Sequence, residues 1–180
     1  MDGMLVETYR SPIPTETHMK IYFLGAGALG CAIGGTLAAA GSDVTLIDPF
    51  EAHVDAIRRD GLRMKDGDTE RVVKVRATLD SSGLEPADLV IVLVKSFHTR
   101  SAIEGAKGIV GPGTAVMSLQ NGMGHEEILS EVVGREHVLA GKTYVGGVLL
   151  GPGHIIAGTR GKRTVIGELD GAISERANAI

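Results

Sequence analysis

Residues 20–35 read KIYFLGAGALGCAIGG, and this stretch decides the fold. Apolar residues follow Lys20 as far as Leu24, which predicts a short buried strand. Glycine then takes five of the next eleven positions, although it has a high entropic cost in regular structure. Gly25, Gly27 and Gly30 form G-x-G-x-x-G between the strand and a helix of small residues. In that context the pattern predicts a dinucleotide-binding loop.

Each glycine of the pattern has its own physical role. Gly25 permits a tight turn, Gly27 lets the backbone approach a pyrophosphate, and Gly30 lets the helix lie close to the strand. The free N–H groups at the start of the helix, together with its dipole, favour the phosphate charge. The predicted cofactor-binding loop therefore consists of Gly25, Ala26, Gly27, Ala28, Leu29 and Gly30.

Asp48 follows the second predicted strand, 43–47, and lies near the spacing of about 20 residues expected after the glycine pattern. Its carboxylate has two possible roles. It can accept hydrogen bonds from an adenosine ribose, which favours NAD over NADP because a 2′-phosphate would be repelled. It can also cap a helix over 48–61 in which Pro49 is the first helical residue. A carboxylate has two oxygens, so both roles are compatible.

The rest of the chain alternates between strand and helix patterns. Strands are predicted at 87–95, 114–119, twice within 62–79 around a DGD turn, and in a β-rich stretch from 138 to 167. Helices are predicted at 28–40, 48–61, 97–107 and 126–133. This alternation predicts an α/β fold with a Rossmann-type, doubly wound parallel sheet, to which the β-rich stretch can add antiparallel edge strands.

Two polar residues stand at the ends of predicted central strands. Lys95 ends the strand at 87–95, and Asn121 follows the strand at 114–119. Ligands bind beyond the carboxyl ends of the strands in such sheets, so both side chains are expected at the crevice of the glycine loop. The alternative is a surface lysine and a turn-forming Asn-Gly pair.

Composition narrows the function. Of the 180 residues 43% are hydrophobic and 22% charged, and the net charge is −4 without a basic block, so no nucleic-acid partner is expected. The single cysteine, Cys31, favours a reducing, cytoplasmic compartment and a buried structural role. Residues 21–41 lack charge, but their six glycines argue against a membrane span or export signal. The six histidines show no metal-type spacing, so no metal is predicted.

Three segments then resemble the ketopantoate reductases (2-dehydropantoate 2-reductases): KIYFLGAGALG at 20–30, ADLVIVLVKSF at 87–97 and QNGMGHEE at 120–127. The resemblance covers 19 to about 170 and matches the N-terminal, cofactor-binding domain of that family. It implies reduction of ketopantoate to pantoate with NAD(P)H, in pantothenate biosynthesis. By the same resemblance Lys95 contacts the cofactor, Asn121 lies near the nicotinamide and substrate, and Gly147 adds a further cofactor contact.

The resemblance also divides the chain. Residues 1–18 are predicted to be a disordered arm, 19–170 the dinucleotide-binding domain, and 171–180 the first turns of a helix leading to a helical domain absent from this chain. The family's catalytic lysine and substrate-binding carboxylate belong to that domain, so no catalytic residue is expected here, and the isolated chain is expected to be inactive. Apolar surface left exposed would favour a homodimer.

One residue departs from the family pattern. The family usually prefers NADPH and often has a basic residue where Asp48 stands, so Asp48 argues for NAD in place of NADP. Related members reduce other 2-keto acids with NADH, so the identity of the small-molecule 2-keto acid stays open. A nicotinamide-binding module without catalysis is the remaining alternative.

Overall fold

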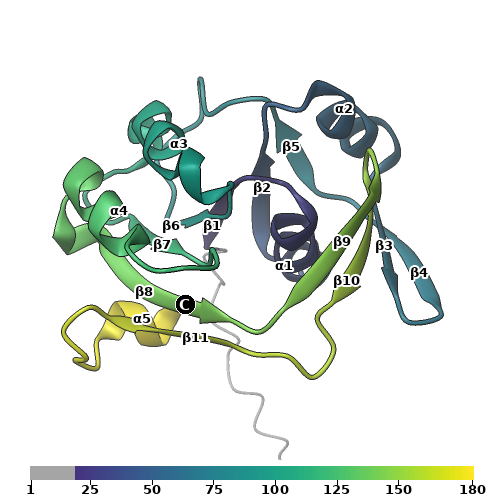
Figure 1. Ribbon diagram of the computed structural model, residues 1–180. Helices are drawn as coiled ribbons and strands as arrows, with labels where there is room; N and C mark the ends of the chain where they lie inside the picture. Colours follow the sequence, from purple (N-terminus) through teal and green to yellow (C-terminus); the bar gives the residue numbers. More distant parts are fainter. Residues whose placement is uncertain (1–18) are drawn as a thin grey trace, which may run out of the picture.

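The computed structural model describes residues 19–180, and the predicted arm at 1–18 lies outside them. A seven-stranded sheet forms the centre (Figure 1). Its strands are β1 (Lys20–Leu24), β2 (Asp43–Ile47), β5 (Arg76–Thr78), β6 (Leu89–Val92), β7 (Ala115–Ser118), β8 (Val138–Thr143) and β11 (Thr164–Glu168). Their order is β11-β8-β7-β6-β1-β2-β5, with every pairing parallel except β11 with β8. The predicted Rossmann-type sheet with an antiparallel edge strand is confirmed.

A second, smaller sheet was not predicted. It consists of β3 (Leu62–Asp66), β4 (Thr69–Val73), β9 (Gly146–Gly151) and β10 (His154–Gly158), in the order β4-β3-β10-β9. The β3–β4 hairpin turns at Gly67, as the DGD pattern indicates. The parallel pairing of β10 with β3, however, joins segments about ninety residues apart. A local sequence pattern carries no information about such a pairing, which depends on the surface that both strands cover.

The helices lie on both faces of the large sheet. They are α1 (Ala28–Ala39), α2 (Glu51–Asp60), α3 (Thr99–Gly105), α4 (His125–Val133) and α5 (Glu175–Ala179), with short 3-10 turns η1 (Ser96–His98), η2 (Lys107–Ile109) and η3 (Arg135–His137). Helix α1 lies between the two sheets, whereas α3 and α4 cover the opposite face (Figure 1). The helix predicted at 97–107 is thus shorter and flanked by 3-10 turns.

Glycines on both sides of α1 let it fit between the two sheets. A Cβ on Gly34 would lie 2.8 Å from the Leu46 side chain and 3.2 Å from the Phe23 ring, both on the large sheet. A Cβ on Gly35 would lie 2.5 Å from the Met64 sulfur, on the small sheet. The sequence predicted one thin helix face. The structure requires two, because α1 is covered on opposite sides.

Side chains of β1 divide between two apolar clusters. Ile21 and Phe23 pack with α1 and the small sheet, whereas Tyr22 and Leu24 pack on the side of α3 and α4. This alternation follows from the two-residue period of a strand. All four residues of β6 are buried, as expected for a central strand covered on both faces.

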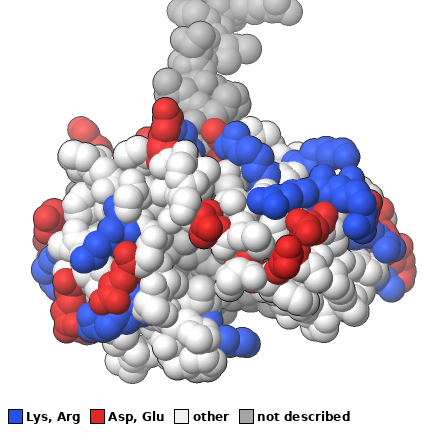
Figure 2. Space-filling model, turned by 90° about the horizontal axis from the view of Figure 1, so that it is seen from above, with Lys and Arg blue, Asp and Glu red and all other residues white. Residues whose placement is uncertain are grey.

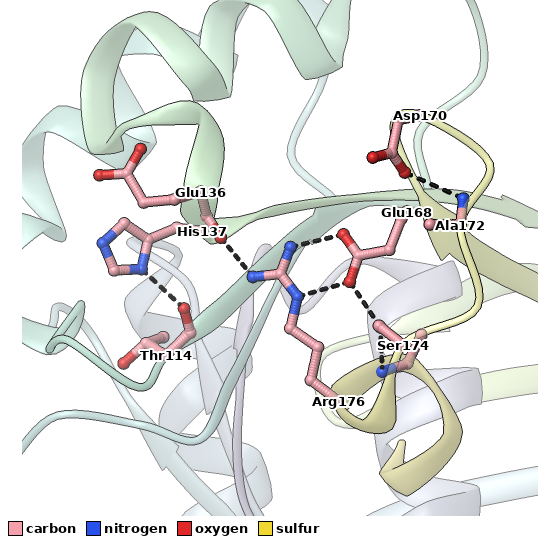
Figure 3. A network of polar contacts seen from close by, with 9 residues as sticks. Thr114, Glu136, His137, Glu168, Asp170, Ala172, Ser174 and Arg176 are labelled. Atoms are coloured by element: carbon pink, nitrogen blue, oxygen red, sulfur yellow. Dashed lines mark hydrogen bonds and ion pairs between the residues drawn. The ribbon is translucent and has the colours of Figure 1, made fainter.

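The last helix is fastened to the edge of the large sheet (Figure 3). Arg176 of α5 donates two hydrogen bonds to the Glu168 carboxylate, at 2.7 and 2.6 Å, and a third to the carbonyl of Glu136. The Ser174 hydroxyl also donates to Glu168, at 2.6 Å. These bonds lower the pKa of Glu168 to about 2. The predicted domain boundary at residue 170 stays a prediction.

Surface charges are paired and mixed in sign. On the face in Figure 2, basic side chains gather on the side of α2, β3 and β4, with acidic side chains among them. Ion pairs in this region include Arg59–Asp60 at 2.7 Å and Arg63–Glu70 at 2.7 Å. Within residues 19–180, no helix has the length and apolar character that crossing a bilayer requires.

We predict that Gly30→Ala lowers the free energy of unfolding by about 2 kcal/mol or more, because the new methyl group would collide with the backbone oxygen of Gly25. Urea denaturation followed by circular dichroism measures the change. Gly105→Ala is the matched control, since a Cβ there meets no atom within 4 Å. Equal stability of both variants would contradict the close packing of α1 on β1.

Candidate cofactor-binding site

A cleft of about 670 Å³ opens beyond the carboxyl ends of the central strands. It lies where the chain order reverses, with β2 on one side of β1 and β6 on the other. Open α/β sheets bind their ligands at this switch point. The volume falls within the range of about 300–1,000 Å³ typical of small-molecule sites.

Five segments meet at the cleft: the glycine loop, the ends of β2, β6 and β7, and the connection from β8 to β9. They supply the lining residues Gly25, Gly27, Ala28, Leu29, Asp48, Pro49, Leu93, Val94, Lys95, Ser96, His98, Gln120, Asn121, Val145, Gly146 and Gly147. All the predicted cofactor-binding residues are among them except Ala26 and Gly30. Those two are buried beneath the loop and shape it without facing the cleft.

The glycine loop leaves the start of α1 open. Gly25 has φ +102°, and a Cβ there would lie 2.7 Å from the backbone of Leu93. Gly27 is the N-cap of α1, no side chain caps this end, and a Cβ on Gly27 would meet nothing within 4 Å. The first N–H groups of a helix have no partner within the helix. They are therefore available to an anionic ligand in the cleft, which is what a dinucleotide diphosphate needs.

Asp48 holds the glycine loop and the following turn together. One carboxylate oxygen accepts from the N–H of Ala26 at 2.8 Å, and the other accepts from the N–H of Phe50 at 2.9 Å. Helix α2 begins at Glu51 with Phe50 as its N-cap, so the predicted capping of a helix starting at Pro49 is wrong. The short Asp48–Phe50 turn competes with the helix for these residues. Each oxygen keeps a further lone pair for a ligand.

Lys95 and Asn121 lie at the same rim, as the strand ends predict. Both are exposed and line the cleft. The loops that carry them touch, because the Ser96 hydroxyl lies 3.5 Å from the carbonyl oxygen of Asn121. The arrangement places a cation and an amide opposite the start of α1.

Gly147 brings the small sheet to the loop. A Cβ at this position would lie 2.7 Å from the carbonyl oxygen of Ala28, so only glycine allows β9 to approach the start of α1. The predicted site residue therefore lies at the cleft, and its contact with the loop requires the second sheet.

His53 was missed by the sequence analysis. It lies on α2, is 2% exposed, and its Nδ1 accepts the N–H of Gly153 at 3.0 Å. The neutral ring then carries its proton on Nε2, which faces the Cys31 sulfur at 3.4 Å. Burial lowers the pKa of His53, against the opposing effects of Asp48 and the Ala26 backbone. The only sequence signal was its place beside Val54 on the buried face of α2.

Cys31 is fully buried, as predicted. Its thiol donates to the carbonyl of Ala26 at 3.0 Å. Burial raises the pKa of Cys31 to about 12, so the nearby imidazole does not make it a thiolate. Together with His53, it supports the loop from below.

A second cleft of about 320 Å³ adjoins the first and shares Gly25, Pro49, Val94 and His98 with it. Its remaining lining is mostly small or apolar: Leu24, Ile47, Leu79, Asp80, Ser81, Ser101, Ala102, Gly105 and Ala106. Such a slot beside an anion-binding loop suits a planar aromatic ring. Residues 19–180 contain no group of three or more His, Cys, Asp or Glu side chains placed to hold a metal ion.

The fold and the cleft together define a Rossmann-type dinucleotide-binding domain. The family model for ketopantoate reductase PanE/ApbA matches residues 21–171. The chain therefore belongs to the ketopantoate reductase family.

Individual relatives agree with this assignment. A 2-dehydropantoate 2-reductase of Pyrococcus horikoshii is 47% identical over 135 residues, which cover 75% of this chain and 43% of that protein. The crystal structure of a ketopantoate reductase from Ralstonia eutropha is 40% identical, with a TM-score of 0.75 over 82% of this chain and 49% of that one. D-mandelate dehydrogenase with NADH and anilino(oxo)acetate is 30% identical, with a TM-score of 0.80 over 89% and 51%. The chain spans about half the length of the curated relatives that it matches.

We predict that His53 makes stability depend on pH below about 6.5. The native state holds the ring neutral, whereas the unfolded chain takes up a proton near its ordinary pKa of 6.5. The stabilisation is therefore complete above pH 6.5 and decreases as the pH falls toward the lowered pKa of the folded state. Urea denaturation between pH 7.5 and 5 measures this slope, which is at most about 1.4 kcal/mol per pH unit for one proton.

The variant His53→Gln should flatten this slope, while His98→Gln, at an exposed position, should keep it. Comparison within the set removes the contribution of the carboxylates, which all three proteins share. An unchanged slope in His53→Gln would show that the ring does not titrate with folding.

Proposed function

We propose that this chain is the cofactor-binding part of a 2-dehydropantoate 2-reductase, which reduces ketopantoate to pantoate with a nicotinamide cofactor on the route to pantothenate. The proposal follows from one observation above all: the uncapped start of α1 faces a cleft whose opposite rim carries Lys95 and Asn121. The family membership supplies the reaction.

The residues of the cleft fit the parts of a dinucleotide. The free amides at the start of α1 suit the diphosphate, and the adjoining apolar slot suits the adenine ring. Asp48 lines the cleft between them, where a ribose hydroxyl can donate to its carboxylate. The nicotinamide half then extends toward the ends of β6 and β7, where Lys95 and Asn121 lie.

The chemistry that the bound cofactor supplies is donation of a hydride to the keto carbon. The cleft residues orient the two reactants, which accounts for a large part of the catalysis of such a reaction. The carbonyl oxygen gains negative charge and needs a cation and a proton donor. In the family that donor is a lysine of the helical domain, so we assign catalysis to residues beyond Ile180 and cofactor binding to this chain.

A second candidate is an NADH-dependent reductase of a different 2-keto acid. Asp48 favours it, because a carboxylate at the end of β2 repels a 2′-phosphate. The similarity to D-mandelate dehydrogenase with NADH and anilino(oxo)acetate also favours it, since that ligand contains a 2-oxo acid group. In both cases the partner is a small-molecule 2-keto acid. The cytoplasmic location and the homodimer stay predictions.

We predict that the chain binds NADH or NADPH with a dissociation constant below about 1 mM, as expected for nicotinamide enzymes. Titration followed by cofactor fluorescence measures it. Gly27→Val should weaken binding at least about tenfold, because its side chain would occupy the open space above the loop. Gly113→Val is the matched control, since a Cβ there also meets nothing within 4 Å. Failure of the parent chain to bind either cofactor would refute the proposed function.

We predict that NADH binds more tightly than NADPH and that Asp48→Asn reduces the difference on the order of tenfold. Asparagine removes the charge but keeps one oxygen acceptor for the backbone amides that Asp48 holds. Parallel titrations with both cofactors measure the ratio. A ratio that does not change in Asp48→Asn would mean that this carboxylate does not choose between the cofactors.

A further inference from the structure

Lys95 and Asn121 both stand beyond the part of the sheet that backbone hydrogen bonds hold. Strand β6 ends at Val92 and β7 ends at Ser118. The last backbone bond between the two segments runs from the N–H of Leu119 to the carbonyl of Val92, at 3.3 Å. The two predicted site residues each lie three positions past their strand, so other contacts must fix their backbone.

The Gln120 side chain supplies the missing bond on the β6 side. Its Nε2 donates to the carbonyl of Val94 at 2.7 Å, and this carbonyl belongs to the peptide that leads into Lys95. Because a carbonyl only accepts, the amide nitrogen must face Val94, which leaves Oε1 for the Ser118 hydroxyl at 2.9 Å. Gln120 thus ties the end of β7 to the backbone beside Lys95.

Thr99 links this amide to a buried histidine. Its hydroxyl lies 2.9 Å from the Gln120 Nε2 and donates to the carbonyl of Ser96 at 2.8 Å. The same hydroxyl lies 3.5 Å from Nδ1 of His125. Thr99 is fully buried and His125 is 5% exposed. Both sit in the interior between α3 and α4, below the rim.

His125 supplies the corresponding contact on the β7 side. Its Nε2 lies 3.1 Å from the carbonyl oxygen of Asn121, so this nitrogen carries the proton and donates. The turn between them contains Gly122 and Gly124, both with positive φ, at +108° and +86°. Such a turn has few bonds of its own, and the ring holds its first residue in place.

We propose that Gln120 and His125 are positioning residues, through which the chain presents Lys95 and Asn121 to the nicotinamide half of the cofactor. The inference rests on the proposed cofactor-binding function. It separates two regions of the cleft: the network lies behind the β6 and β7 ends, whereas the apolar slot for adenine is lined by residues at the ends of β2 and β5. Damage to the network should therefore affect one half of the ligand more than the other.

The experiment compares two ligands, the preferred dinucleotide of the chain and AMP, which carries only the adenine half. Gln120→Met keeps the side-chain length and His125→Phe keeps a ring, while each removes the hydrogen bonds. We expect both variants to weaken the dinucleotide about tenfold and AMP by less than about twofold. The matched control is His137→Phe, which removes a ring bonded to Thr114 at the other end of β7 and should change neither affinity.

A double-mutant cycle separates positioning from general damage. If Gln120 acts through Lys95, then Gln120→Met should have little further effect in a Lys95→Ala background. Fully additive effects, parallel weakening of both ligands, or no weakening at all would each overturn the proposal. A parent chain that binds AMP but neither dinucleotide would overturn the proposed function itself, and a parent chain that binds the dinucleotide normally leaves only the positioning role to be judged.

Discussion

The structure depends on one close approach, between the start of α1 and the backbone of the glycine loop. Gly30 faces the Gly25 carbonyl with no room for a side chain, and Gly25 itself turns against the Leu93 backbone. This approach directs the free amides of α1 into the cleft and brings the strand ends around them. A single methyl group at either position would separate the anion-binding helix end from the sheet that positions the other ligand-facing groups.

The loop is also supported from inside the protein. Asp48 accepts the Ala26 N–H, the Cys31 thiol donates to the Ala26 carbonyl, and His53 connects this region to Gly153 in the turn between β9 and β10. The second sheet is thereby joined to the loop at two places, because Gly147 of β9 also approaches Ala28. The small sheet consequently acts as a support for the cofactor loop, on the side of α1 opposite the large sheet.

The rim of the cleft has a comparable internal support. Where the β6–β7 ladder ends, side chains take over the hydrogen bonding, with Gln120 on one segment and His125 on the other. Buried polar groups of this kind are costly unless they are satisfied, so a fully bonded network makes one backbone arrangement strongly preferred. Lys95 and Asn121 remain exposed, but the peptides that carry them are fixed.

The sequence by itself determined the large sheet, the glycine loop and the shared rim of Lys95 and Asn121. These follow from local rules: apolar runs make strands, glycine spacing makes the turn, and parallel strands end at one edge. Only the tertiary structure decided the second sheet, the start of α2 at Glu51 and the contacts of His53. Each of these joins residues far apart in the chain or lets a side chain compete with a helix end, and no local pattern records such contacts.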